Sequence, residues 1–110
     1  MKTLIYLATP YNDPDPTIRE QRFCIVNGVA ARLMREGYHI FSPISHTHPI
    51  ALAGDLPKGW DFWHEFDKAV LSACAKVIVL RQPGWETSTG VKAEIKLAQE
   101  MGLSVEYIDQ

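Results

Sequence analysis

Short runs of strand-forming residues alternate with longer segments of helical periodicity along this chain, and this alternation constrains the fold more than any other feature. The strand-like runs occupy residues 3–8, 38–41, 76–80 and 103–108, with helix-like segments between them. Strands that alternate with helices pair in parallel through right-handed crossovers, and the helices cover both faces of the sheet. We therefore expect an α/β fold: a small flavodoxin-like or Rossmann-like three-layer sandwich around a four- to five-stranded parallel sheet.

Local signals mark where the helix-like segments begin. Thr17 and Glu20 match a capping box, so we expect the first helix to open at Thr17. Ser88 or Thr89 is expected to cap the last helix. Residues 44–59 carry Gly and Pro residues and two histidines without a clear period, which predicts a loop.

The composition is that of one globular domain covering residues 1–110, with 46% hydrophobic and 22% charged residues. A net charge of -2 provides no electrostatic attraction toward a nucleic-acid polymer or an anionic membrane. The N-terminus is a poor signal peptide, and no apolar run reaches the roughly 18 residues of a membrane helix. Cys24 and Cys74 lie in apolar segments that we assign to helices, and buried free thiols fit a reducing compartment. We expect a cytoplasmic protein.

Ligands of open parallel sheets bind beyond the carboxyl ends of the strands, where the strand order reverses. The loops predicted at that edge cover residues 9–16, 42–59 and 81–88. The sequence contains neither G-x-x-x-x-G-K-[ST] nor G-x-G-x-x-G, which disfavours classical ATP or dinucleotide binding. We expect no cofactor.

Two carboxylates fall where the helical pattern calls for apolar side chains. At about 100° per residue, Glu94 lies between Ala98 and Met101 in the apolar arc of the last helix. Asp67 lies on the apolar side of the helix predicted over residues 60–74. A carboxylate that faces the core must be hydrogen-bonded, paired with a cation or protonated.

These inward carboxylates have two interpretations. They could be a pair of catalytic carboxylates whose pKa values the surroundings adjust. Alternatively, each could form a buried salt bridge or cap a loop. The arginines available for such a salt bridge are Arg19, Arg22 and Arg32.

Several other residues are candidates for substrate binding. Ser88 and Gly90 begin a helix whose free N–H groups could cradle an anion, or they could form a plain N-cap. Arg19, in the first turn of its helix, could bind an anionic group or form an ordinary ion pair. Trp63 and Trp85 could stack on a planar ligand or fill the core.

The segment His46-Thr47-His48 places two histidines on a predicted loop. Two ligands are too few for a zinc site, so we expect no metal. His46 is expected to line or cover the ligand pocket instead.

Three motifs give the chain a resemblance to a known family. They are Ile5-Tyr6-Leu7-Ala8-Thr9-Pro10, His64-Glu65-Phe66-Asp67 and Ser88-Thr89-Gly90-Val91-Lys92-Ala93-Glu94. Together they resemble the nucleoside 2-deoxyribosyltransferase superfamily, which includes the 2'-deoxynucleoside 5'-monophosphate N-glycosidases, and most of all its small bacterial and phage members.

The resemblance implies roles for individual residues. Glu94 would be the nucleophile, Tyr6 would touch its carboxylate, and Asp67 would handle the base and the sugar. Thr9 and Pro10, which close the first motif, would contact substrate. The resemblance also implies a homo-oligomer in which a neighbouring subunit completes the site.

The helical pattern and the resemblance select the same two acids. We expect cleavage, by hydrolysis or transfer, of the N-glycosidic bond of a nucleoside or nucleoside 5'-monophosphate. The alternative is a non-catalytic nucleotide-binding or sensor module on the same fold. The sequence leaves open the base, the sugar and the phosphorylation state.

Overall fold

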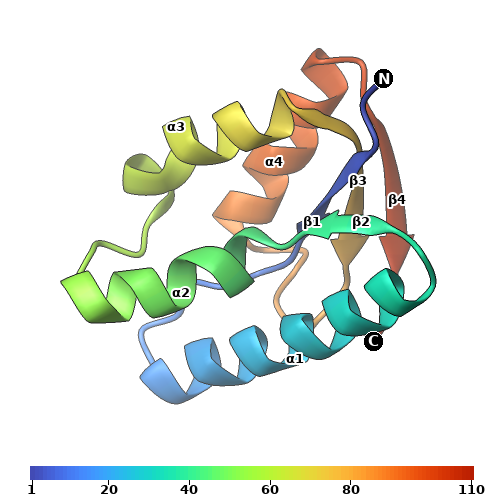
Figure 1. The fold of residues 1–110 in the computed structure, drawn as a ribbon. Helices are drawn as coiled ribbons and strands as arrows, with labels where there is room; N and C mark the ends of the chain where they lie inside the picture. The colour runs from blue at the N-terminus through green and yellow to red at the C-terminus, as the bar shows by residue number, and fades with distance from the viewer.

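The computed structural model describes all 110 residues as one α/β domain (Figure 1). Four strands form a single parallel sheet, which confirms the predicted fold class. None of the helices is long and apolar enough to cross a membrane. The elements are β1 (Leu4–Ala8), α1 (Pro16–Arg35), β2 (His39–Phe41), α2 (Pro43–Gly54), α3 (Trp60–Leu71), β3 (Cys74–Leu80), α4 (Thr89–Glu100) and β4 (Ser104–Ile108).

The strand order is β2-β1-β3-β4, so β1 and β3 occupy the centre of the sheet. Tyr6 on β1 pairs with Phe41 on β2 and with Val77 on β3. In the sheet, β2 lies on one side of β1, whereas β3 and β4 lie on the other side of β1. The order therefore reverses between β1 and β3, and ligands of such sheets bind beyond the carboxyl ends of the strands at this point.

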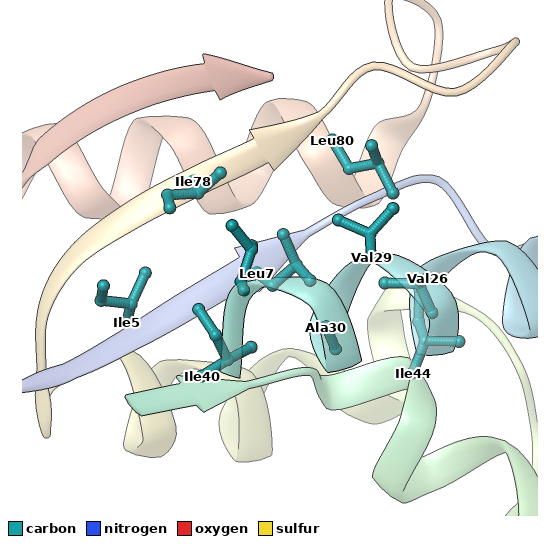
Figure 2. Close-up of a cluster of buried hydrophobic side chains, with 10 residues drawn as sticks. Ile5, Leu7, Val26, Val29, Ala30, Ile40, Ile44, Ile78 and Leu80 are labelled. Carbon is teal, nitrogen blue, oxygen red and sulfur yellow. The ribbon is translucent and has the colours of Figure 1, made fainter. Parts of the chain in front are cut away.

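The central strand β1 is buried on both faces because successive side chains point to opposite sides of the sheet. Ile5 and Leu7 pack with Val26 of α1 on one face, in the cluster that Figure 2 shows. Tyr6 packs with Val91 of α4 on the other face, which α3 and α4 cover. The polar hydroxyl of Tyr6 therefore lies beneath α3 and α4.

The expected loop over residues 44–59 is wrong for residues 44–54, because Pro43–Gly54 forms α2. The Ser42 side chain caps this helix by accepting a hydrogen bond from the backbone N–H of Ser45. Ile44, His48 and Ala51 form its buried face at positions i, i+4 and i+7. This spacing was hidden because a histidine occupies one of the three buried positions.

The first helix begins one residue earlier than the capping box predicted. Asp15 is the N-cap, and its carboxylate accepts a hydrogen bond from the N–H of Thr17 at 2.9 Å. Pro16 takes the first helical position, where its missing N–H costs no hydrogen bond. The Asp-Pro pair, rather than Thr17 with Glu20, therefore sets the start of α1.

The two cysteines differ in burial and in the kind of element that contains them. Cys24 lies on α1 and is exposed, so the expectation that both thiols are buried is wrong for it. Cys74 is buried as expected, but it begins β3 rather than ending a helix. Helix α3 ends at Leu71, and after a short turn β3 begins at Cys74, ahead of the strand predicted from residue 76.

Candidate active site

A cavity of about 510 Å³ lies at the carboxyl edge of the sheet, a size typical of small-molecule sites. Its wall comes from the loops after β1 and β3 and from α1, α2, α3 and α4. The residues of the wall that the sequence predicted as site residues are Thr9, Pro10, Trp63, Asp67, Ser88, Gly90 and Glu94.

Glu94 and Tyr6 are in direct contact although 88 residues separate them in the sequence. Tyr6, at 0% exposure, lies on the central strand, and its hydroxyl donates a hydrogen bond to Glu94 Oε2. Glu94 lies in the second turn of α4 and is 5% exposed. The rigid centre of the sheet therefore holds the phenol that orients this carboxylate.

Asp67, on α3, is the second carboxylate of the cavity wall and is 9% exposed. The ion pairs of the structure involve other acidic residues, so neither Asp67 nor Glu94 has a cationic partner. Arg32 lies 4.0 Å from Glu36 instead. The salt-bridge interpretation of the two inward carboxylates is therefore wrong.

Burial without a cation shifts the pKa values of this cluster upward. Burial raises the pKa of Glu94 well above its usual range, and the charge of Asp67 raises it further, whereas the hydrogen bond with Tyr6 opposes the rise. Burial raises the pKa of Asp67 to about 6, again against hydrogen bonding with Tyr6. The pKa of Tyr6 rises well above its usual value through burial and the two nearby carboxylates.

Two carboxyl groups this close and this buried resist ionising together. At neutral pH, Tyr6 keeps its proton because its pKa is raised, so it remains a hydrogen-bond donor. When the two acids share one proton, a single negative charge removes the repulsion between them, and Glu94 still accepts the hydrogen bond that Tyr6 donates. The cluster can thus hold a nucleophile and a proton donor side by side.

The start of α4 forms the wall next to Glu94. Of the two N-cap candidates in the sequence, Ser88 and Thr89, Ser88 is the cap, and its hydroxyl accepts a hydrogen bond from the N–H of Val91 at 3.2 Å. Ser88, Thr89 and Gly90 all line the cavity. The segment is therefore both a helix cap and a wall from which the positive end of a helix dipole favours an anion.

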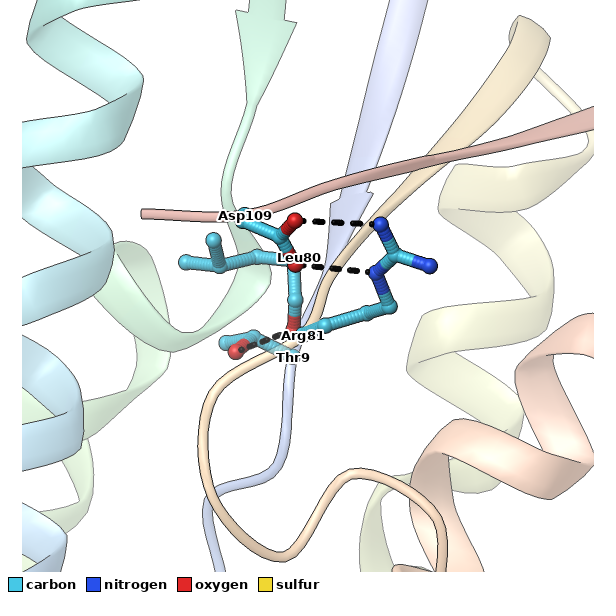
Figure 3. Close-up of polar contacts among 4 residues, drawn as sticks. All are labelled: Thr9, Leu80, Arg81 and Asp109. Atoms are coloured by element: carbon cyan, nitrogen blue, oxygen red, sulfur yellow. Dashed lines mark hydrogen bonds and ion pairs between the residues drawn. The ribbon is translucent and has the colours of Figure 1, made fainter.

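Thr9 lines the cavity, but its hydroxyl is engaged in holding the edge of the sheet together (Figure 3). It donates to the carbonyl of Leu80 at 3.3 Å and accepts from Nε2 of Gln82 at 2.8 Å. Arg81 pairs with Asp109 beside this contact, with Nε 3.0 Å from Oδ1. These bonds join the ends of β1, β3 and β4, which fixes the loops that carry the cavity.

Arg19 and Trp85 do not belong to the wall, which corrects two sequence-based assignments. The Arg19 guanidinium donates to the carbonyl of Asp13 and so braces the loop after β1. Trp85 is partly buried and packs against the core cluster that contains Tyr6 and Val91, with its ring 5.7 Å from that of Tyr107. Arg22, one helical turn beyond Arg19, is the arginine that lines the cavity.

His46 is likewise outside the wall, and His48 takes its place. On α2 the two side chains point in different directions, because residues two apart on a helix lie on different faces. His46 stacks on Phe66 at a centroid distance of 5.8 Å. His48 faces the cavity and the core. Because this segment is a helix and not the expected loop, His48 lines the cavity and His46 does not.

The raised pKa of Asp67 predicts how stability depends on pH. Between the usual pKa of 3.8 and about 6, the folded protein retains a proton that the unfolded chain releases. We therefore expect this group to lower the unfolding free energy by about 2 kcal/mol as the pH rises through that window. Denaturant titrations at pH 4, 5, 6 and 7 should show this slope.

Asp67→Asn should weaken that pH dependence and stabilise the protein at pH 7. Glu86→Gln, at an exposed position outside the cluster, should leave the slope unchanged. Equal slopes for the parent protein and Asp67→Asn would show that burial of the ionised Asp67 carboxylate does not destabilise the folded protein.

Comparisons with known proteins place the whole chain in one family. The family model described as "Domain of unknown function (DUF1937)" matches residues 3–110. A search of curated proteins found no significant match. The family description names no reaction, so the chemistry of the site has to be inferred from its own residues.

Proposed function

The chain belongs to the DUF1937 family, and from the geometry of its site we propose that it cleaves the N-glycosidic bond of a nucleoside or nucleoside 5'-monophosphate. The observation that carries this proposal is the buried cluster of Tyr6, Glu94 and Asp67, which lies at one cavity without a cationic partner. The three motifs that resemble the nucleoside 2-deoxyribosyltransferase superfamily support it, since they contain the same residues.

Glu94 is the nucleophile. Its Oε attacks C1' of the sugar as the bond from C1' to the base nitrogen breaks, through an oxocarbenium-like transition state. The product of this step is an ester between Glu94 and C1'. Tyr6 donates its hydrogen bond to Oε2 and so directs the carboxylate toward the sugar.

Asp67 is the general acid. Its pKa of about 6 leaves a protonated fraction near neutral pH, and this proton passes to the departing base nitrogen. The carboxylate left on Asp67 can then take a proton from the acceptor that attacks C1' and releases Glu94. Water as the acceptor makes the protein a hydrolase, and a second base makes it a transferase.

The start of α4 and Arg22 bind the 5' end of the substrate. Ser88, Thr89, Gly90 and Arg22 all line the cavity. The Arg22 guanidinium also donates to the carbonyls of Tyr11, Asn12 and Pro83, which hold it in place. Together the start of α4 and Arg22 suit a phosphate, whose charge is stabilised at a helix N-terminus and by a guanidinium. Trp63, on the same wall, offers an aromatic face for the base.

We further propose that the protein acts in the cytoplasm as a homo-oligomer. The compartment is inferred from the two free cysteines, and the oligomer is inferred from the family resemblance alone.

The direct test is chromatographic detection of free base after incubation with a panel of nucleosides and nucleoside 5'-monophosphates. We expect release from at least one member of the panel, and no release with Glu94→Gln. Absence of release from every member, together with a nucleotide-dependent rise in melting temperature, would instead indicate a nucleotide-binding module.

A further inference from the structure

Helix α3 contributes two tryptophans to the cavity wall, and the proposed mechanism uses only one of them. Trp60 and Trp63 both line the cavity, together with Asp67 on the same helix. These three residues occupy positions i, i+3 and i+7, so they share one face of α3. That face forms a strip along the cavity wall, with two aromatic side chains at one end and the general acid at the other.

Neither tryptophan belongs to the hydrophobic core. Both side chains are partly buried, and neither packs against the two clusters of buried apolar residues that join the helices to the sheet. The indole N–H of Trp63 donates to the carbonyl of Pro57 at 2.7 Å, and the ring lies edge to face with Phe62 at a centroid distance of 4.9 Å. The core therefore does not account for these two large aromatic side chains at the cavity, whereas a planar ligand would.

The strip is longer than a single aromatic ring. At 1.5 Å per residue, Trp63 lies about 6 Å and Trp60 about 10 Å from Asp67 along the helix axis. In Figure 1, α3 begins at the outer end of the molecule and runs toward the sheet, so its first residue, Trp60, is the outermost of the three. Lys58 and Gly59, which precede α3, also line the cavity. The cavity therefore extends along α3 past Trp63 and past Trp60.

The proposed mechanism fixes where the base lies on this strip. Glu94 contacts Tyr6 of the central strand, so the sugar that it attacks lies at the sheet end of the cavity. Asp67 passes its proton to the departing base nitrogen, which places one edge of the base at Asp67. From there the base extends outward along α3. A single pyrimidine ring reaches Trp63 and stops short of Trp60, whereas the two fused rings of a purine reach both.

We propose that Trp60 is a specificity-determining residue and that the substrates of this protein are purine nucleosides or nucleotides. This inference rests on the proposed function, since it names the substrate class of that site. A purine stacks on Trp63 and Trp60 together, whereas a pyrimidine stacks on Trp63 alone and leaves the outer end of the cavity to water. Because loss of one base–aromatic contact weakens binding by roughly fivefold to a hundredfold, the second tryptophan selects purines.

Binding, measured without turnover, tests this selection. Calorimetry with Glu94→Gln compares the 2'-deoxynucleoside 5'-monophosphates of adenine and guanine with those of cytosine and thymine. We expect both purine nucleotides to bind roughly tenfold or more tightly than either pyrimidine nucleotide. Affinities that do not separate by the number of rings in the base would overturn the proposal.

Replacing Trp60 by Leu tests whether this residue makes the selection. Added to Glu94→Gln, Trp60→Leu should weaken the purine nucleotides roughly tenfold and have little effect on the pyrimidine nucleotides, so that the ratio falls close to one. Trp63→Leu should instead weaken both classes. Phe62→Leu, on the same helix but exposed and outside the cavity wall, is the matched control and should leave the ratio unchanged. An equal loss for both classes with Trp60→Leu, or no loss for the purine nucleotides, would contradict the role of Trp60.

Kinetics of the parent protein separate a failure of this inference from a failure of the proposed function. We expect kcat/KM to favour purine over pyrimidine substrates in the parent, and Trp60→Leu to lose this preference without a lower melting temperature, because Trp60 packs against neither core cluster. Release of base from both classes at equal kcat/KM would overturn the purine assignment alone. Absence of release from every substrate, with the binding preference intact, would overturn only the proposed catalysis. Absence of both release and binding would overturn both.

Discussion

Replacing Glu94 by Gln is expected to lower kcat for release of the base by roughly 10⁴-fold or more, because the amide cannot form the covalent bond to C1'. The fold should survive, since the Gln carbonyl can still accept the hydrogen bond that Tyr6 donates. Single-turnover assays with saturating substrate measure this loss directly, without a contribution from product release.

Glu100→Gln is the matched control. It makes the same chemical change on the same helix, at an exposed position outside the cavity. Its activity should stay within a few-fold of the parent, and melting curves should show both variants folded. Activity of Glu94→Gln within a few-fold of the parent would exclude Glu94 as the nucleophile.

Replacing Asp67 by Asn should lower kcat by about 10²- to 10⁴-fold for an ordinary base, because general acid catalysis contributes about this much. The loss should be far smaller with an N7-methylated purine nucleotide. Its base already carries a positive charge and departs without receiving a proton, so the general acid has little to contribute. The ratio of the two losses separates proton donation from simple binding.

The control for this variant is Glu65→Gln, which alters an exposed carboxylate on the same helix. It should change neither rate by more than a few-fold. An equally large loss with both substrates in Asp67→Asn would show that Asp67 binds or orients the substrate and does not protonate the base.

The positions of the two acids could be predicted from the sequence because each interrupts a regular pattern. A helix that covers a sheet shows apolar residues along one face, and a carboxylate on that face must lie against the sheet or in a cavity beside it. Glu94 and Asp67 both met this condition and are both buried in the cavity wall. The contact of Glu94 with Tyr6 could be expected only from the family resemblance, since periodicity says nothing of contacts between β1 and α4.

The rest of the wall could not be located in this way. Arg19 and Arg22 are both polar residues at the start of α1, and sequence periodicity does not say which of them turns toward the cavity. His46 and His48 were indistinguishable while their segment was expected to be a loop. The spacing of Ile44, His48 and Ala51 contained the necessary signal, but it is readable only if a buried histidine is allowed on an apolar face.

By itself the sequence determined the order of the strands and of three of the four helices, the parallel sheet and the inward position of two carboxylates. These follow from periodicity and short-range capping, which act within a few residues of the chain. The tertiary structure decided which side chains meet: Tyr6 with Glu94 across 88 residues, and Tyr11 with His48 across 37. Such contacts depend on how three layers pack around the point where the strand order reverses, and no local pattern carries that information.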